Sequence, residues 1–234
     1  MDAIINSPYH EDMKHNFITN SGSDNPLSIL TRQKTKIRLA KNNLPEVKVL
    51  PLLAIENIRT EREIGTRSII LFALKSISIY PEDMQDIKEW LYENLKAGLT
   101  PDEAQSLSKS KLDVQSEIRF SWYQESLYAL LWCLSIVPHM SEPNKEADID
   151  SYLEIFPPEK SIDSFLKHCK LRTIDELQLE LDYYYNLHWL SRHRSDFKAE
   201  SVRNLNKSII LERRKALEWV LDEKLLWDDI SLDT

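Results

Sequence analysis

The sequence predicts an all-α protein: a single globular domain of about seven to nine helices around one central buried helix. Three observations favour this fold class. Glycine occurs only at Gly22, Gly65 and Gly98 of 234 residues, which argues against a β-sandwich, a Gly-rich phosphate loop or a dinucleotide fingerprint. Long runs contain residues of high helix propensity, such as Leu, Glu, Lys and Ala. Apolar residues recur at helical spacing, and no segment shows the alternation of a half-buried strand.

The N-terminal part divides into an extension and the first two helices. Residues 1–25 are polar and aperiodic, so we expect a flexible extension, which leaves residues 26–234 for the helical domain. A helix is predicted over DNPLSILTRQKTKIRLAKNN, with Asp24 or Asn25 as its cap and Pro26 in its first turn. Two prolines in residues 44–57 are typical of a connector, and a helix is expected over residues 60–79.

The middle of the chain contains three further helices with clear boundaries. YPEDMQDIKEWLYENLKAG predicts a helix that begins at Pro81 and ends at Gly98. The next helix begins with TPDE, a capping box in which Thr100 caps the backbone and Glu103 reaches back. A long helix is expected over residues 114–137. The Pro-containing acidic segment over residues 141–160 is predicted to be a loop.

The C-terminal part contains the predicted central helix. A short helix is expected near residues 161–170. TIDE, from Thr173 to Glu176, is a second capping box and begins the helix that contains LDYYYNLHWLSRHR. Bulky apolar side chains on nearly every face of this helix predict that it is buried. The last helix is expected over residues 202–224, followed by a tail.

Each of the four long helices has an apolar stripe that one ionisable residue interrupts. The interruptions are Arg67, Glu125, His188 and Arg213. A lone buried charge costs several kcal/mol, so each must be paired or must line a wet cavity. We therefore expect one cluster, in which Glu125 pairs with Arg213 or Arg67, and His188 or Asp182 completes the network. The candidate site comprises Arg67, Glu125, Asp182, His188, Arg192 and Arg213.

The residue types of this cluster are compatible with three kinds of chemistry: acid–base catalysis, metal binding and anion binding. Glu125, His188 and Asp182 have the residue types of general acids and bases, but no serine lies in a nucleophile elbow, so structural pairing is favoured over catalysis. The histidines lack metal-ligand spacing, so the sequence predicts no metal site and no cofactor. The arginines match an anion site for a phosphate or carboxylate. Because the acids nearly balance the bases, internal neutralisation is the favoured interpretation.

The formal net charge of −8 disfavours wholesale nucleic-acid binding and favours a basic partner. One basic run, TRQKTKIRLAK, is interpreted as a solvated helix face rather than a nucleic-acid arm. Acidic residues crowd the loop and the C-terminus and form a candidate surface for a basic, toxin-like partner. These residues are Glu142, Glu146, Asp148, Asp150, Asp228, Asp229 and Asp233.

The cysteines and the apolar segments predict the cellular compartment of the protein. Cys133 and Cys169 match no zinc or redox motif and are predicted to be buried free thiols, as in a reducing cytoplasm. The first residues lack a basic region followed by an apolar core, so no signal peptide is expected. The longest apolar runs, SIILFAL and YALLWCLSIV, are too short to span a bilayer. The sequence therefore predicts a cytoplasmic protein without a membrane anchor, and it specifies no oligomeric state.

Five blocks carry a resemblance to a known family. RSIILFAL, WYQESLYALLWCL, DYYYNLHWLSR, ERRKALEW and WDDISLDT resemble, in the same order, the blocks of the uncharacterised bacterial family named domain of unknown function 4272. The resemblance runs from about Leu44 to Thr234. It implies a helical, cytoplasmic bacterial protein and implies no activity. The matching positions include Arg67, Glu125, Trp132, Asp182, His188, Trp189, Arg192, Glu212, Arg213, Arg214, Trp219, Trp227, Asp228 and Asp229.

Two classes of function stay open from the sequence. The first is a non-catalytic interaction protein, and an immunity-type protein that neutralises a basic toxin is its most concrete version. The second is an enzyme or sensor that binds an anionic small molecule at the Arg, His and Glu cluster. A closed, fully paired cluster favours the first class, and an open cavity at Arg213 favours the second.

Overall fold

The helices of this protein stack on one another, and no strand occurs among the described residues. The computed structural model describes residues 25–53, 55 and 57–232, so nearly all of the predicted flexible extension lies outside the described part. The α-helices are α1 (Pro26–Lys41), α2 (Glu61–Ile79), α3 (Met84–Asn94), α4 (Pro101–Leu107), α5 (Val114–Cys133), α6 (Ile162–His168), α7 (Ile174–Arg192), α8 (Glu200–Arg203) and α9 (Lys207–Leu221). Short 3-10 helices occur at Pro81–Asp83, Lys96–Gly98, Asp150–Ile155, Arg194–Asp196 and Trp227–Asp229.

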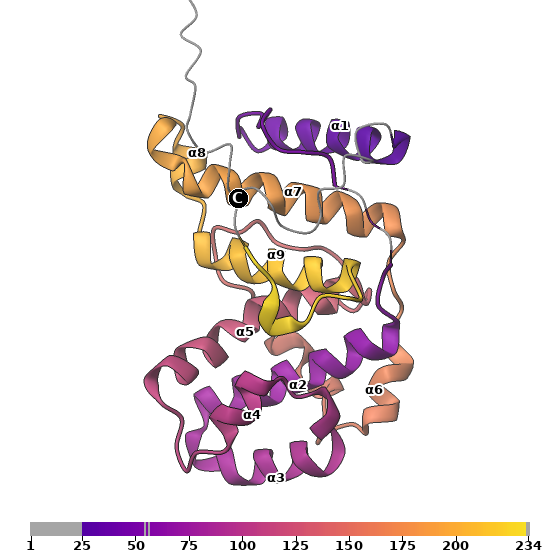
Figure 1. Ribbon diagram of the computed structural model, residues 1–234, viewed down its shortest axis with the longest axis vertical. Coiled ribbons are helices and arrows are strands. Elements are labelled where there is room, and N and C mark those ends of the chain that lie inside the picture. The colour runs from indigo at the N-terminus through magenta and orange to yellow at the C-terminus, as the bar shows by residue number, and fades with distance from the viewer. Residues whose placement is uncertain (1–24, 54, 56, 233–234) are drawn as a thin grey trace, which may run out of the picture.

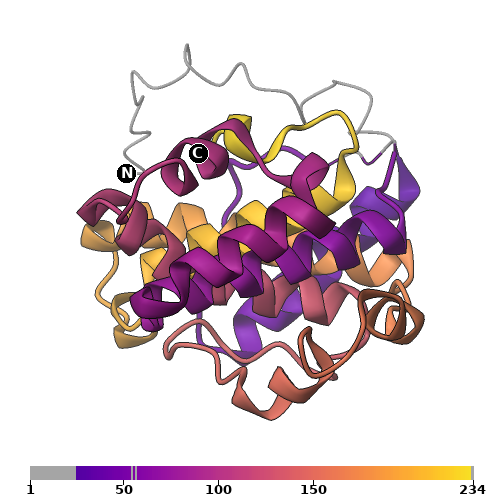
Figure 2. The same cartoon turned by 90° about the horizontal axis from the view of Figure 1, so that it is seen from below.

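The long helices pack in a fixed order that differs from their order in the chain. α1 packs on α7, α7 on α9, α9 on α5 and α5 on α2 (Figure 1). α3 and α6 then contact α2. Figure 2, seen from below, shows α3 and α2 in front of the orange and yellow α7 and α9. The stack therefore alternates segments that are far apart in the sequence.

Side-chain caps explain where most of these helices begin. The predicted capping boxes at Thr100 and Thr173 are confirmed, and Thr60 forms a third at the start of α2. The side chain of Asn25 accepts a hydrogen bond from the backbone N–H of Leu27 at 2.9 Å and caps α1. Asp113 caps α5 in the same way, through the N–H of Ser116 at 2.8 Å. Each cap supplies an acceptor to an N–H group that has no partner within the helix.

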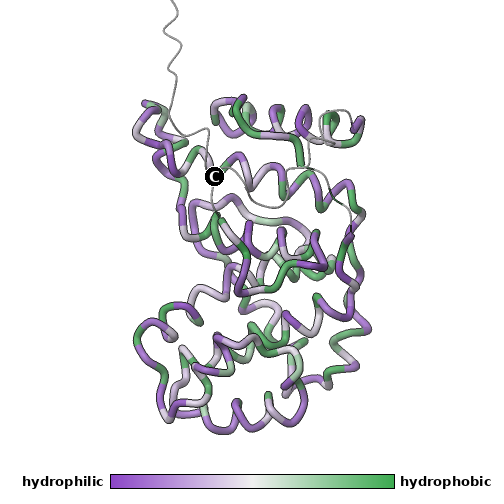
Figure 3. The backbone as a smooth tube through the Cα atoms, viewed as in Figure 1, coloured by the Kyte–Doolittle hydropathy of each residue, from purple (hydrophilic) through white to green (hydrophobic). Residues whose placement is uncertain are grey.

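α7 is covered on two sides, by α1 and by α9. Tyr183, Tyr184, Leu187 and Leu190 are all fully buried along it. Figure 3 shows short hydrophobic and hydrophilic stretches alternating along the helices. Within the described part of the chain, no helix is long and apolar enough to cross a membrane.

The helix predicted over residues 114–137 ends early, at Cys133. Ser135 has a φ of 58°, in the left-handed region, and so the chain turns away from the helix axis there. The carbonyl oxygens of Cys133 and Leu134 accept hydrogen bonds from the N–H groups of Arg172 and Lys170, at 2.9 and 3.1 Å. Hydrogen bonds to a distant segment thus replace the helical hydrogen bonds at this end of α5. The local sequence does not predict this replacement.

The helix predicted over residues 202–224 is wrong in its length, because two helices, α8 and α9, occupy this segment. The side chain of Asn206 caps α9 by accepting from the N–H groups of Ser208 and Ile209, at 3.0 and 3.4 Å. The N–H of Asn206 donates to the carbonyl of Pro143 at 3.0 Å. Asn206 therefore starts a new helix where the helical periodicity alone predicts continuation.

Replacement of Asn206 with alanine tests this boundary. We expect Asn206→Ala to lower the free energy of unfolding by about 1 kcal/mol, because α9 loses its side-chain cap. Urea unfolding followed by circular dichroism measures the change. Asn204→Ala is the matched control, since Asn204 is exposed and its side chain caps no helix. Equal stability of the two variants would show that the cap does not define the start of α9.

Candidate functional site

The predicted pair of Glu125 and Arg213 forms at the centre of the stack. Arg213 of α9 donates through Nε to Glu125 Oε2 of α5 at 2.8 Å, and both side chains are at most 1% exposed. Arg213 Nη1 also donates to the hydroxyl of Tyr184 at 2.9 Å. The guanidinium lies over the ring of Tyr128, with 4.9 Å between Cζ and the ring centroid. The charge of Arg213 is thus neutralised and hydrogen-bonded inside the protein.

This ion pair also holds the first part of the acidic loop. Arg213 donates to the carbonyl oxygen of Ser141 and, at 3.3 Å, to its hydroxyl oxygen. Glu125 Oε1 accepts from the N–H of Ala147 at 2.7 Å. Gln124, the neighbour of Glu125, donates to the carbonyl of Ala147 at 2.5 Å. Residues 141–147 are therefore fixed to α5 and α9 by bonds to buried side chains.

Arg67 forms a separate pair that does not reach Glu125. Arg67 of α2 donates through Nη1 to Glu103 Oε2 of α4 at 2.9 Å, and its guanidinium lies 4.3 Å from the ring centroid of Trp227. Burial alone raises the pKa of Glu103, but the charge and hydrogen bonds of Arg67 outweigh it and hold the pKa below its ordinary value. The same carboxylate accepts from the N–H of Thr100 at 3.0 Å. The sequence identified Glu103 only as a capping residue.

Asp182 pairs with an arginine that the sequence placed on a solvated face. Arg32 of α1 donates to both carboxylate oxygens of Asp182 of α7, with distances of 2.8 to 3.1 Å. Its remaining donors reach the carbonyl oxygens of Leu50 and Pro51 at 2.9 and 2.8 Å. The interpretation of the basic run is thus wrong for Arg32, which is buried, while Lys34 and Lys36 of the same run are exposed.

His188 contacts the arginine next to Arg213 in the chain. The guanidinium of Arg214 in α9 donates to His188 Nδ1 of α7, and Arg214 Nε donates to Glu218 Oε1 at 2.7 Å. A guanidinium only donates, so the imidazole accepts with an unprotonated Nδ1. Burial, followed by the positive charges of Arg214, Arg192 and Lys207, lowers the pKa of His188 to about 3. Arg192 itself is exposed at the end of α7.

The prediction of a single cluster is therefore wrong, although one of its pairs is confirmed. The candidates fall at four interfaces: Arg32–Asp182 between α1 and α7, Arg214–His188 between α7 and α9, Arg213–Glu125 between α9 and α5, and Arg67–Glu103 between α2 and α4. In a stack, successive helices face different neighbours, so ionisable residues at matching places on their stripes do not converge. No group of three or more potential metal ligands occurs within the described residues.

The acidic candidates are all exposed where they are described. Glu142, Glu146 and Asp148 lie on the loop, Asp150 begins the 3-10 helix that follows it, and Glu142 accepts a hydrogen bond from the hydroxyl of Tyr183 at 2.9 Å. Asp228 and Asp229 lie on the last 3-10 helix, and Asp228 accepts from the N–H of Asp102 at 3.3 Å. Asp233 lies outside the described residues.

The serines near the candidate acids donate hydrogen bonds within the helical framework. Ser126 donates to the carboxylate of Glu212 at 2.6 Å, and burial raises the pKa of that carboxylate. Ser121 and Ser191 donate to carbonyl oxygens of their own helices, those of Ile118 and His188, at 2.7 and 2.8 Å. The predicted burial of the two cysteines is confirmed, and both are free thiols.

The fold and these pairs define a class: an all-helical protein in which separate ion pairs neutralise arginines buried between the helices. The chain belongs to the family described as a domain of unknown function (DUF4272), whose model matches residues 31–230. The match begins before residue 44, where the resemblance was expected to begin, and so includes most of α1 with Arg32. No curated protein and no solved structure matches the chain.

Removal of the central guanidinium tests the structural role of the Glu125–Arg213 pair. We expect Arg213→Ala to lower the free energy of unfolding by about 3 kcal/mol, because Glu125 keeps a buried charge without its partner. Chemical denaturation measures this loss. Arg203→Ala removes an exposed arginine of α8 and should change stability by less than about 0.5 kcal/mol. Unchanged melting of Arg213→Ala would contradict the assigned role.

The low pKa of His188 predicts a dependence of stability on pH. The unfolded chain takes up a proton near pH 6.5, whereas the folded protein resists protonation of His188 down to about pH 3. The stability that neutral His188 contributes is therefore complete above about pH 6.5 and is lost as the pH falls toward 3. His188→Asn keeps an acceptor for Arg214 but does not titrate.

Urea midpoints at several pH values measure this effect. Below about pH 6.5, the wild-type protein should lose up to about 1.4 kcal/mol per pH unit more than His188→Asn does. The matched control is His168→Asn, since His168 is exposed on α6. Parallel curves for the wild-type protein and His188→Asn would rule out a contribution of His188 in this range.

Proposed function

We propose that this chain is a non-catalytic protein-interaction module of the bacterial cytoplasm, and that its acidic loop binds a basic protein. Neutralisation of a basic toxin, as by an immunity protein, is the most concrete form of this proposal. One observation carries this proposal: the buried Glu125–Arg213 pair holds the loop that presents the exposed acids of residues 142–150.

Pre-organisation of the loop is the first argument. Ser141 and Ala147 are bonded to Arg213 and Glu125, and the carbonyl of Pro143 accepts from the N–H of Asn206. A segment held in this way loses little conformational freedom when it binds, and this loss is a main cost of association. The loop therefore offers its carboxylates in a fixed arrangement.

The charge of the loop is the second argument. Residues 142–150 contain four exposed acids and one basic residue, Lys145, and Arg38 of α1 pairs with one of these acids, Glu142, at 3.6 Å. Glu146, Asp148 and Asp150 have no ion-pair partner within 4.0 Å among the described residues. Unpaired charges of one sign attract a partner of the other sign and accelerate its association.

Internal pairing argues against the alternative function, an anion site at the Arg, His and Glu cluster. Arg67 already binds Glu103, and Arg213 binds Glu125 and the hydroxyl of Tyr184. Arg192 is exposed and lies apart from both pairs, at the end of α7. An external phosphate or carboxylate at either buried arginine must displace a buried carboxylate, which leaves that carboxylate unpaired at high cost.

The test uses the protein encoded beside the gene of this chain. The triple variant Glu146→Lys, Asp148→Lys, Asp150→Lys should lower the association rate with a basic neighbour at least about tenfold at low salt. Surface plasmon resonance at two salt concentrations measures the rate. The matched control, Asp86→Lys, Glu89→Lys, Glu93→Lys, changes three exposed acids of α3 and gives the same net charge.

Two results would overturn the proposal. One is the absence of binding to, and of protection against, any basic neighbour. The other is an equal loss of association rate in both triple variants, which would assign the effect to overall charge instead of the loop.

A further inference from the structure

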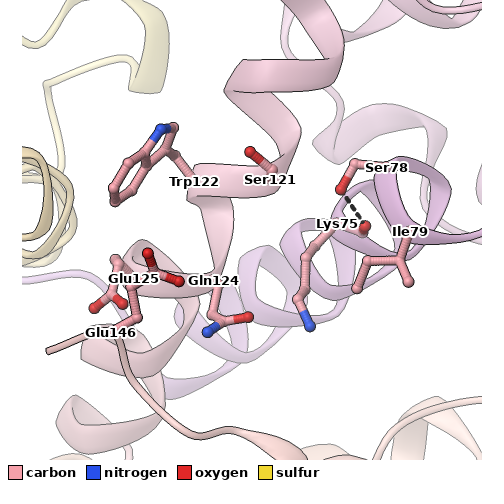
Figure 4. A pocket seen from close by; sticks show the side chains of 8 residues that line it. All are labelled: Lys75, Ser78, Ile79, Ser121, Trp122, Gln124, Glu125 and Glu146. Carbon is pink, nitrogen blue, oxygen red and sulfur yellow. Dashed lines mark hydrogen bonds between the residues drawn. The ribbon is translucent and has the colours of Figure 1, made fainter.

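A pocket lies between the end of α2, the middle of α5 and the acidic loop. Its volume is about 270 Å³, and it is lined by Lys75 and Ile79 of α2, by Trp122, Gln124 and Glu125 of α5, and by Glu146 of the loop. Figure 4 shows the ammonium of Lys75 apart from the two carboxylates, with the amide of Gln124 between them. This pocket is at the interface of α2 and α5, away from the four ion pairs described above except at Glu125.

Lys75 is the residue of this pocket that lacks a counter-charge among the described residues. Its side chain is only 7% exposed, yet no carboxylate lies within 4.0 Å of its ammonium among the described residues. Burial lowers the pKa of Lys75, and the more distant charge of Asp150 partly opposes this effect. The ammonium reaches the pocket and has no carboxylate in contact within the described part of the chain, so the free space beside it is a natural position for an anionic group.

The other side of the pocket has the opposite character. Glu146 is exposed and has no ion pair in the described structure, so its carboxylate remains available to a cation. The carboxylate of Glu125 is already bonded to Arg213 and to the N–H of Ala147. Trp122 and Ile79 add apolar surface between the charged ends. The lining thus combines one free cation, one free anion and an apolar wall.

We propose that this pocket binds a small zwitterion, with its carboxylate on Lys75, its ammonium on Glu146 and its apolar body against Trp122 and Ile79. The volume is below the usual range for pockets of drug-sized ligands, which begins at roughly 300 Å³, and suits a molecule of amino-acid size. The carboxylates of Glu125 and Glu146 repel a multiply charged anion such as a nucleotide. Glu146 belongs to both the pocket and the acidic surface, whereas Lys75 belongs only to the pocket, so a change of Lys75 tests this site without altering the acidic surface.

The test titrates the protein with γ-aminobutyrate and ε-aminocaproate, two zwitterions of different length. Caproate, which lacks the amine, and hexylamine, which lacks the carboxylate, are the matched ligands. The indole N–H signal of Trp122 in nuclear magnetic resonance spectra, assigned with Trp122→Phe, reports occupancy of the pocket. We expect saturable shifts with at least one zwitterion in the millimolar range, and at least about tenfold weaker binding of caproate and hexylamine.

Two substitutions locate the charges that bind the ligand. Lys75→Met should weaken binding of the zwitterion at least about tenfold and should not lower the melting temperature, because methionine keeps the apolar part of the side chain and no ion pair of the described structure is lost. Glu146→Gln should remove the preference for the zwitterion over caproate. Lys34→Met, an exposed lysine of α1, is the control and should bind like the wild-type protein.

Several results would overturn this inference. They are the absence of any shift with both zwitterions, equal binding of caproate and ε-aminocaproate by the wild-type protein, and unchanged binding by Lys75→Met.

Discussion

A guanidinium group that leaves water must meet its counter-charge inside the protein, and this constraint governs the stack of helices. Arg213, which is fully buried, meets Glu125, and the same two side chains bond the backbone of Ser141 and Ala147. α5, α9 and the acidic loop are thereby tied together at one point. Other interfaces repeat the pattern on a smaller scale, as with Arg32 and Asp182 between α1 and α7. Such pairs add little net stability compared with apolar packing, but a mispaired helix leaves a buried charge, so they favour one order of packing.

The interface between α2 and α5 departs from this pattern. Lys75 is 7% exposed there and has no acid in contact among the residues that the structure describes, and a pocket lies beside its ammonium. Everywhere else in the described core, a buried arginine has internal acceptors. The buried arginines thus hold the helices together, whereas Lys75 faces the free space of the pocket. The acidic loop, which reaches this pocket through Glu146, links the two regions proposed to bind partners and ligands.

Local signals explain which elements the sequence predicted well. Caps act within a few residues, so Asn25, Thr100 and Thr173 identify the starts of α1, α4 and α7 directly. The ends of helices depend on other segments, and so they were predicted less well. α5 ends at Cys133 because Arg172 and Lys170 bond its last carbonyl groups, and α9 begins anew at Asn206, whose backbone bonds Pro143. The periodicity of apolar residues within a helix does not predict such distant hydrogen-bond partners.

The sequence by itself determined the helical fold class, the burial of Arg67, Glu125, His188 and Arg213, and the need of each charge for a partner, because these follow from periodicity and from the cost of desolvation. Only the tertiary structure decided the partners. Glu103 and Arg32 were both visible in the sequence, but as a cap and as part of a basic run. Which charges meet depends on which helices are neighbours, and the order of the stack differs from the order of the chain. For the same reason, the packing of α2 against α5 decides that Lys75 has no ion pair within the described part of the chain.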